Sequence, residues 1–170
     1  MIKSKINLRS AGLLDAKKFA YIKAEAYADD RLKCKPDEDN IPEWYNGEWY
    51  LGLAIIDETE ATRLIENYYC YIILLEETPI GIFWLHHETE DSLALEDFCI
   101  LPVYQGQGYG TKVLKLMEEL YPNNKIWTLG TPYFCKRNRH LYEKVGYQYV
   151  GTASNNTVIL YKKWTTDNLY

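Results

Sequence analysis

The residues best suited to chemistry form a glycine-rich turn between a strand pattern and a helix pattern. The turn reads Gln105-Gly106-Gln107-Gly108-Tyr109-Gly110 and leads into helical spacing from Thr111. Three glycines at alternate positions remove the β-carbons, so a ligand can approach the main chain. Successive N–H groups at a helix start, reinforced by the helix dipole, bind phosphate groups. The turn therefore predicts an anion site that needs no Lys or Arg, with a plain tight connection as the alternative.

Two common phosphate-binding loops do not fit this spacing. A GxxxxGK[ST] loop counted from Gly106 needs its second glycine at Thr111, and Gly110-Thr111-Lys112 has the wrong order. A dinucleotide GxGxxG loop also needs glycine at position 111, and an acidic residue about 20 positions later. That later position falls near Gly130, where the sequence has no acidic residue. The spacing therefore argues against both classes of nucleotide-binding protein.

The elements around this turn predict one α/β domain over residues 1–170. Alternating β-branched and aromatic residues indicate strands, and apolar residues at helical spacing indicate helices. Strands are expected at residues 5–8, 68–75, 80–86, 92–101, 125–129, 147–150 and 157–161, and helices at 12–27, within 48–67, at 108–121 and at 135–145. Residues 29–47 are polar and interrupted by two prolines, which predicts a loop or short helical turns.

Composition excludes several classes of function. The chain has 170 residues, of which 47% are hydrophobic and 25% charged, as is typical of a globular domain. A net charge of −5 argues against binding to nucleic acid, which needs clustered Lys and Arg. Neither a signal-peptide pattern nor a run of about 20 apolar residues is present, so we expect a cytoplasmic protein without membrane contact. The four scattered cysteines are expected to be reduced thiols.

The turn resembles motif A of the GCN5-related N-acetyltransferases (GNAT), [QR]xxGx[GA], with Gln105, Gly108 and Gly110 at the defining places. A second stretch, Asn138-Arg139-His140-Leu141-Tyr142-Glu143-Lys144-Val145-Gly146-Tyr147, is similar to the family segment FYEKxGF. The matched region runs from about residue 68 to 150. The resemblance implies a mixed, mostly antiparallel sheet of six or seven strands flanked by about four helices. It also implies acetyl-CoA as cosubstrate, bound by that region.

The same resemblance assigns cofactor residues. The pyrophosphate would lie on the main chain of Gln105, Gly106, Gln107, Gly108, Tyr109, Gly110 and Thr111. Main-chain groups of Phe98, Cys99 and Ile100 would hold the pantetheine arm and the acetyl carbonyl. A donor that supports the oxyanion there can lower the barrier by about 3–4 kcal/mol. Where many family members have an asparagine that contacts pantetheine, this sequence has Cys135, and Asn138 is the alternative contact.

Transfer to an amine also needs a base, because an amine with a pKa of about 10 is protonated at neutral pH. Glu96 precedes Phe98 by two residues, and the Leu-Glu-Asp-Phe string resembles the strand of diamine and polyamine acetyltransferases in which this glutamate is the base. Asp97 is the weaker candidate, since strand alternation directs it to the opposite face. A salt bridge is the structural alternative for either carboxylate. Tyr142 matches the family tyrosine that protonates the CoA thiolate, with simple packing as the alternative.

Other reactive residues are better explained by structure. Cys99 lies on an apolar strand with no evident histidine partner, which is typical of a core residue. His86 and His87 would point to opposite faces, so no metal site is predicted. Carboxylates and aromatic rings alternate over residues 37–50, at Asp37, Glu38, Asp39, Trp44, Tyr45, Glu48, Trp49 and Tyr50. They would suit a cationic amine, and the alternative is a solvated acidic loop anchored by its aromatic side chains.

The expected function is direct transfer of the acetyl group of acetyl-CoA to a primary amine of a small molecule, with a polyamine-like or other cationic amine favoured. Two alternatives stay open. One is a protein or peptide N-terminal acetyltransferase, and the other is a non-catalytic acyl-CoA-binding regulatory module. The resemblance also allows a homodimer.

Overall fold

The computed structural model describes residues 5–41, 45, 57–154 and 156–165. Its main elements are β1 (Ile6–Ser10), α1 (Ala16–Lys33), α3 (Glu58–Asn67), β2 (Tyr69–Leu75), β3 (Thr78–Thr89), β4 (Ser92–Ile100), α4 (Tyr109–Leu120), β5 (Ile126–Pro132), α5 (Lys136–Lys144), β6 (Gln148–Ala153) and β7 (Val158–Trp164). Short 3-10 turns cover Leu13–Asp15, Glu38–Asn40 and Pro102–Tyr104. The expected mixed α/β fold is confirmed.

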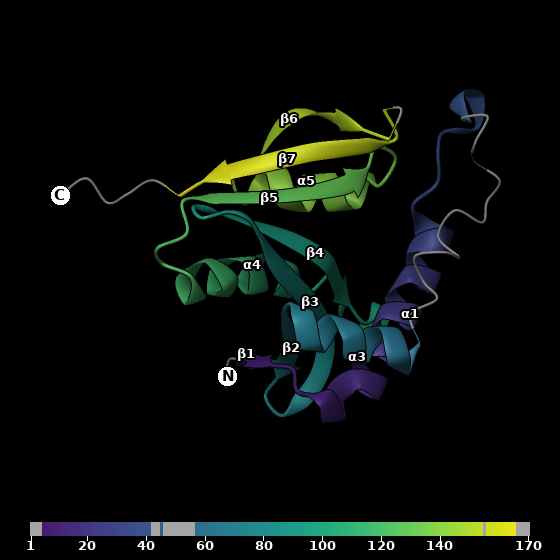
Figure 1. Cartoon of the computed structure of the whole chain (residues 1–170). Helices are drawn as coiled ribbons and strands as arrows, with labels where there is room; N and C mark the ends of the chain where they lie inside the picture. The colour runs from purple at the N-terminus through teal and green to yellow at the C-terminus, as the bar shows by residue number, and fades with distance from the viewer. Residues whose placement is uncertain (1–4, 42–44, 46–56, 155, 166–170) are drawn as a thin grey trace.

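The seven strands form one sheet in the order β1-β2-β3-β4-β5-β7-β6. The pair β4–β5 is parallel and the other neighbours are antiparallel. Pairing between β4 and β5 covers only three positions, from Ser92 opposite Ile126 to Ala94 opposite Thr128. Beyond Ala94 the two strands separate, and the sheet splits into two parts (Figure 1).

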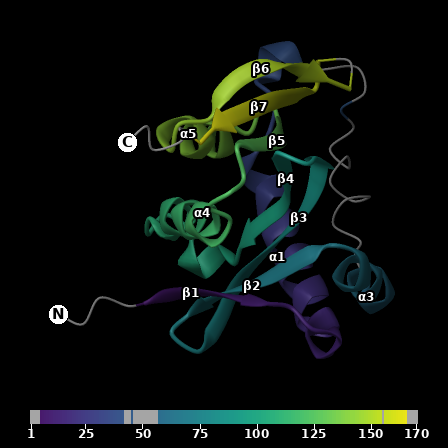
Figure 2. The ribbon, with the colours of Figure 1, turned by 60° about the vertical axis from the view of Figure 1, so that its left-hand side comes forward.

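The sheet lies between two helical layers, with α4 and α5 on one face and α1 and α3 on the other (Figure 2). Strand alternation divides the core in the same way, because successive side chains point to opposite faces. Phe83 and Leu85 of β3 pack on the α4 side, in the same cluster as Met117. Ile82 packs with Phe19 of α1 on the opposite face. None of the helices in the described ranges is both long and apolar enough to cross a membrane.

Helix α1 is longer than predicted. The pattern indicated an end at Tyr27 and a polar loop from Asp29, whereas the helix continues to Lys33. The extra turn carries an ion pair one helical turn apart, with Lys33 Nζ 2.7 Å from Asp29 Oδ2. The helical register also directs Asp30 toward the split in the sheet, where it borders both clefts described below.

Candidate active site

The glycine-rich turn lies between the end of β4 and the start of α4, and its main chain is open. Gly106 and Gly108 have φ angles of 73° and 79°, in the left-handed region that favours glycine. A β-carbon at either position would meet no atom within 4 Å, so the space above the turn is free for a ligand. Gly108 is the N-cap of α4, so the first N–H groups of the helix face this space without helical acceptors.

Gly110 has a different role. A β-carbon there would lie 3.1 Å from Cδ2 of Leu141 and 3.9 Å from Cε1 of Phe98. The absence of a side chain at Gly110 therefore allows the first turn of α4 to pack closely against Leu141 of α5.

The turn borders a cleft of about 370 Å³ between α4 and α5. Most of the predicted cofactor residues line this cleft: Phe98, Cys99, Ile100, Gln105, Gly106, Gly108, Tyr109, Gly110, Thr111 and Asn138. Gln107 is different, because its exposed side chain donates a hydrogen bond to the Val103 carbonyl oxygen at 3.0 Å. Cys135 is fully buried at the start of α5, against Cys34 and Phe134. The structure thus brings Asn138, and not Cys135, to the cleft.

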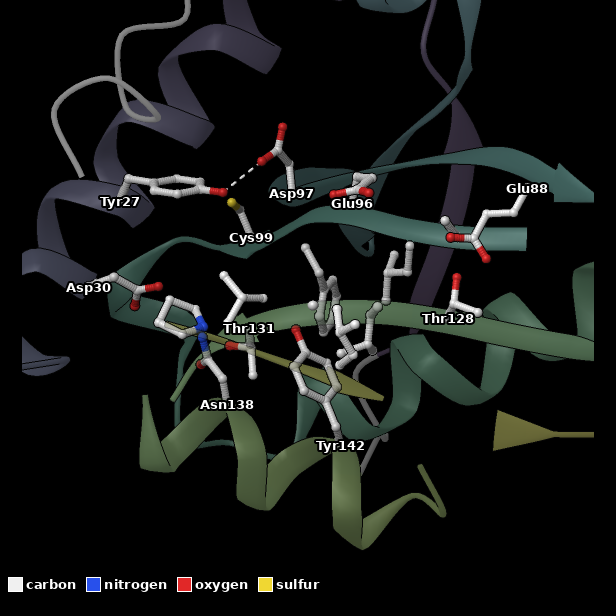
Figure 3. A pocket seen from close by; sticks show the side chains of 18 residues that line it. Tyr27, Asp30, Glu88, Glu96, Asp97, Cys99, Thr128, Thr131, Asn138 and Tyr142 are labelled. Carbon is white, nitrogen blue, oxygen red and sulfur yellow. Dashed lines mark hydrogen bonds between the residues drawn. The ribbon is translucent and has the colours of Figure 1, made fainter. Parts of the chain in front are cut away.

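A second cleft, of about 400 Å³, opens at the split between β4 and β5 (Figure 3). Four carboxylates line it, from Asp30, Glu88, Glu96 and Asp97. No Lys, Arg or His of the described part of the chain lines it. Asp97 and Asp30 pair with Lys23 and Arg137, which lie outside this lining. The charged side chains that line this acidic cleft are nevertheless all carboxylates, which favours a cationic ligand.

The two clefts meet between the separated strands. The residues that line both are Asp30, Phe98, Cys99, Asn138 and Tyr142. A ligand in the cleft beside the glycine turn and a ligand in the acidic cleft can therefore contact one another at these residues.

Glu96 is set up to exchange a proton near neutral pH. The pKa of its carboxyl group is raised to about 7, mainly by burial and then by the negative charges of Asp97 and Glu88, with Lys23 opposing them. Within the described residues, no side chain or main-chain group donates a hydrogen bond to this carboxylate. A partly buried carboxylate of this kind can act as a general base.

Tyr142 extends from α5 into the same space, below the strand that carries Glu96 (Figure 3). Its side chain is 7% exposed. Burial is the main reason why the pKa of its hydroxyl lies above the usual range, with smaller contributions from neighbouring acidic groups such as Asp30. The hydroxyl is therefore protonated at neutral pH and is available as a proton donor.

The prediction that Asp97 faces away from Glu96 is wrong. In the β3–β4 ladder, Ile82 pairs with Cys99 but Trp84 pairs with Glu96, so two residues of β4 oppose one residue of β3. This β-bulge includes Asp97, whose φ is 45°. The extra residue interrupts strand alternation, and Glu96 and Asp97 both reach the acidic cleft.

Sequence reasoning missed several residues around the acidic cleft. Glu88 follows Trp84 at an even spacing on β3, and this period-two signal could have placed it on the same face. Asp30 could be placed at the cleft only once α1 was known to continue to Lys33. Of the acidic and aromatic stretch, Asp37 pairs with Lys136 at 2.8 Å. Tyr45 contacts the ring of Phe134, while Trp44, Glu48, Trp49 and Tyr50 lie outside the described residues.

The four cysteines are free thiols and all are buried. Burial raises the pKa of the Cys99 thiol well above its usual value, so this thiol is a poor nucleophile at neutral pH. Cys99 lies in the core cluster that includes Ile82 and Phe19, as expected for a core residue.

Comparison with known proteins identifies the family. Residues 24–147 match the profile of the Acetyltransferase (GNAT) family. The chain belongs to this family. Its GNAT fold is also seen in PaiA N-acetyltransferase from Thermoplasma acidophilum in complex with coenzyme A, with a TM-score of 0.74, 14% identity, and coverage of 95% of this chain and 99% of that one.

Two further similarities are informative. RimL, a ribosomal L7/L12 alpha-N-protein acetyltransferase in complex with coenzyme A, aligns with a TM-score of 0.71 at 12% identity, over 96% of each chain. YrkN of Bacillus subtilis (strain 168), an uncharacterized protein, is 40% identical over 83 residues. That match covers 47% of this GNAT chain and 44% of YrkN, so it spans less than half of that relative.

Proposed function

We propose that this GNAT protein transfers the acetyl group of acetyl-CoA to a primary amine of a small cationic molecule, with polyamine-like amines favoured. The observation that carries the proposal is the meeting of two unlike clefts at the split between β4 and β5. One has the open main chain of a helix N-terminus, and the other has four carboxylates. The coenzyme A complexes of PaiA and RimL support the choice of cosubstrate.

Acetyl-CoA fits the first cleft. The pyrophosphate would accept hydrogen bonds from N–H groups between Gly106 and Thr111, where glycine leaves the main chain uncovered. The pantetheine arm would lie along Phe98, Cys99 and Ile100 of β4. This part of β4 has no pairing with β5, so the main-chain groups on that side can bond to the arm instead.

The acceptor fits the second cleft because its carboxylates attract an ammonium group. Glu96 would remove a proton from the ammonium, directly or through water, and leave a neutral amine. The amine nitrogen then attacks the acetyl carbonyl carbon, and a C–N bond forms. When the tetrahedral intermediate collapses, the C–S bond breaks and the Tyr142 hydroxyl donates a proton to the departing sulfur. The second proton lost by the attacking nitrogen would return to the Tyr142 oxygen through water, and the proton held by Glu96 would pass to solvent. The products are an N-acetylated amine and coenzyme A.

Thermal unfolding tests the cosubstrate first. Acetyl-CoA at about 100 times its dissociation constant should add about 2.7 kcal/mol of stability and raise Tm by roughly 5–10 °C, while NAD and ATP should not. Release of the CoA thiol should then be measured with a diamine, a polyamine, an aminoglycoside, an amino acid and a peptide with a free N-terminus. Turnover of the peptide alone would contradict the small-amine proposal. A thermal shift without turnover of any amine would favour a non-catalytic acyl-CoA-binding module.

A further inference from the structure

The bulge in β4 is held by hydrogen bonds that converge on one side chain. Asp97 Oδ2 accepts from Lys23 Nζ at 2.7 Å and from Trp84 Nε1 at 2.8 Å. Asp97 Oδ1 accepts from the Tyr27 hydroxyl at 2.6 Å (Figure 3). The donors come from α1 and from β3, so the carboxylate connects the helix layer to two strands.

This cluster is well shielded from water. The side chains of Lys23 and Asp97 are 10% and 13% exposed. Breaking a buried ion pair by removing one partner leaves an uncompensated charge, so such a contact strongly restricts the conformation around it. Three donors also occupy the oxygens of Asp97, which leaves them poorly placed to accept a proton from a substrate.

The backbone conformation at position 97 also restricts which residue types fit there. Its φ of 45° lies in the left-handed region, which residues other than Gly, Asn and Asp rarely adopt. Without the bulge, regular alternation would place Glu96 and Asp97 on opposite faces of the sheet. With it, both carboxylates reach one cleft.

We propose that Asp97 is a positioning residue for the transfer reaction: held by Lys23, Tyr27 and Trp84, it fixes the bulge directly after Glu96 and places a fixed negative charge beside the Glu96 carboxylate. This inference rests on the proposed function, in which Glu96 is the base. It assigns to the Asp97 carboxylate an electrostatic and conformational role in place of proton transfer.

The charged groups that face Glu96 predict opposite shifts of its pKa for two substitutions. Asp97 on β4 and Glu88 on β3 raise the pKa of Glu96, whereas Lys23 on α1 lowers it. Tyr27 of α1 and Tyr142 of α5 also border this space. Asp97→Asn should therefore lower the pKa of Glu96, and Lys23→Met should raise it. Asp91→Asn removes an exposed carboxylate that pairs with Lys125, and it serves as the charge-matched control.

The test is an NMR titration of the Glu96 carboxyl carbon in the full chain. We expect the midpoint to move by about 0.5 pH unit or more, downward in Asp97→Asn and upward in Lys23→Met, with no movement in Asp91→Asn. An unchanged midpoint, or the same direction in both variants, would overturn the proposal. If Asp97→Asn does not fold, the direction in Lys23→Met decides alone.

Turnover separates the conformational role from the electrostatic one. Asn tolerates the left-handed region and Ala does not, so at a pH above the Glu96 midpoint Asp97→Ala should lose about tenfold more turnover than Asp97→Asn. Equal losses in the two variants would overturn the conformational role. Wild-type turnover in Glu96→Gln would instead refute the base assignment in the proposed function, and it would leave the NMR titration valid.

Discussion

Nη1 of Arg137, on α5, lies 2.7 Å from Oε1 of Gln105, in the glycine-rich turn. The same Gln105 donates from Nε2 to the carbonyl oxygen of Ile100 at 2.7 Å. Arg137 also forms an ion pair with Asp30 of α1. The two ends of the Gln105 amide group are thus both hydrogen-bonded, its oxygen to Arg137 and its nitrogen to Ile100. These bonds hold the end of β4 in place relative to the turn.

Arg137→Met should therefore weaken acetyl-CoA binding. Loss of the hydrogen bond to Gln105 loosens the turn, and we expect KM for acetyl-CoA to rise about 3–10-fold with a smaller change in kcat. Steady-state kinetics at saturating amine measures this. Arg63→Met removes an arginine whose partner is Glu60, on α3, and it should leave KM unchanged. An equal rise in both variants would show that the turn does not depend on Arg137.

The raised pKa of Glu96 predicts two pH dependences. As a base, Glu96 must be deprotonated, so kcat/KM should rise with pH through a midpoint near 7. Glu96→Gln should abolish this rise and lower turnover about 100-fold or more.

The free energy of unfolding should fall with rising pH over the range in which kcat/KM rises. The folded-state pKa is above the usual value, so the folded protein holds this proton more tightly than the unfolded chain. That contribution is fully present below the unfolded pKa and is lost as pH rises through about 7. After allowance for solvent screening, Glu96→Gln should be more stable than wild type at pH 8, by up to about 2 kcal/mol. Urea unfolding at pH 5 and pH 8 checks this, and a variant that is less stable at pH 8 would refute it.

Tyr142→Phe should lower kcat by about 10²-fold or more with little effect on KM for acetyl-CoA, because it removes only the proton donor. Tyr147 is the matched control. It is also buried, its ring centroid lies 5.9 Å from that of Tyr142, and it lines neither cleft. If Tyr147→Phe reduced kcat as strongly, the effect would belong to packing.

Glu88→Gln should discriminate among acceptors. It removes one carboxylate of the acidic cleft, so KM for a diamine or polyamine should rise about 3–10-fold while KM for a monoamine changes less. The difference should shrink at high salt. Glu90, an exposed neighbour outside the acidic cleft, provides the control variant Glu90→Gln. A uniform rise for all amines would argue against charge recognition by Glu88.

Local patterns were sufficient to predict the residues that line the cleft beside the glycine-rich turn. The turn, α4 and α5 are continuous segments, and their glycine spacing and apolar periodicity predicted these elements, while the choice of Tyr142 came from the resemblance of residues 138–147 to the family segment. The main chain does most of the predicted binding there, so the exact side-chain partners matter little.

The acceptor side depends on contacts between distant segments. The bulge at Asp97 is stabilised by Lys23, 74 positions earlier in the chain, and no pattern within β4 reveals such a partner. Regular alternation was therefore the natural expectation, and it failed at this residue. Asp30 was missed for a related reason, since Arg137 of α5 pairs with it across the fold.

The short pairing of β4 with β5 also has a mechanical consequence. Three residue pairs join the two halves of the sheet directly, so a pantetheine arm that is hydrogen-bonded to β4 in the gap would add contacts between them. Part of the binding free energy would then reduce the motion of the two halves relative to one another. Amide hydrogens of residues 95–100 should exchange faster than those of residues 92–94 in the free protein, and acetyl-CoA should slow them.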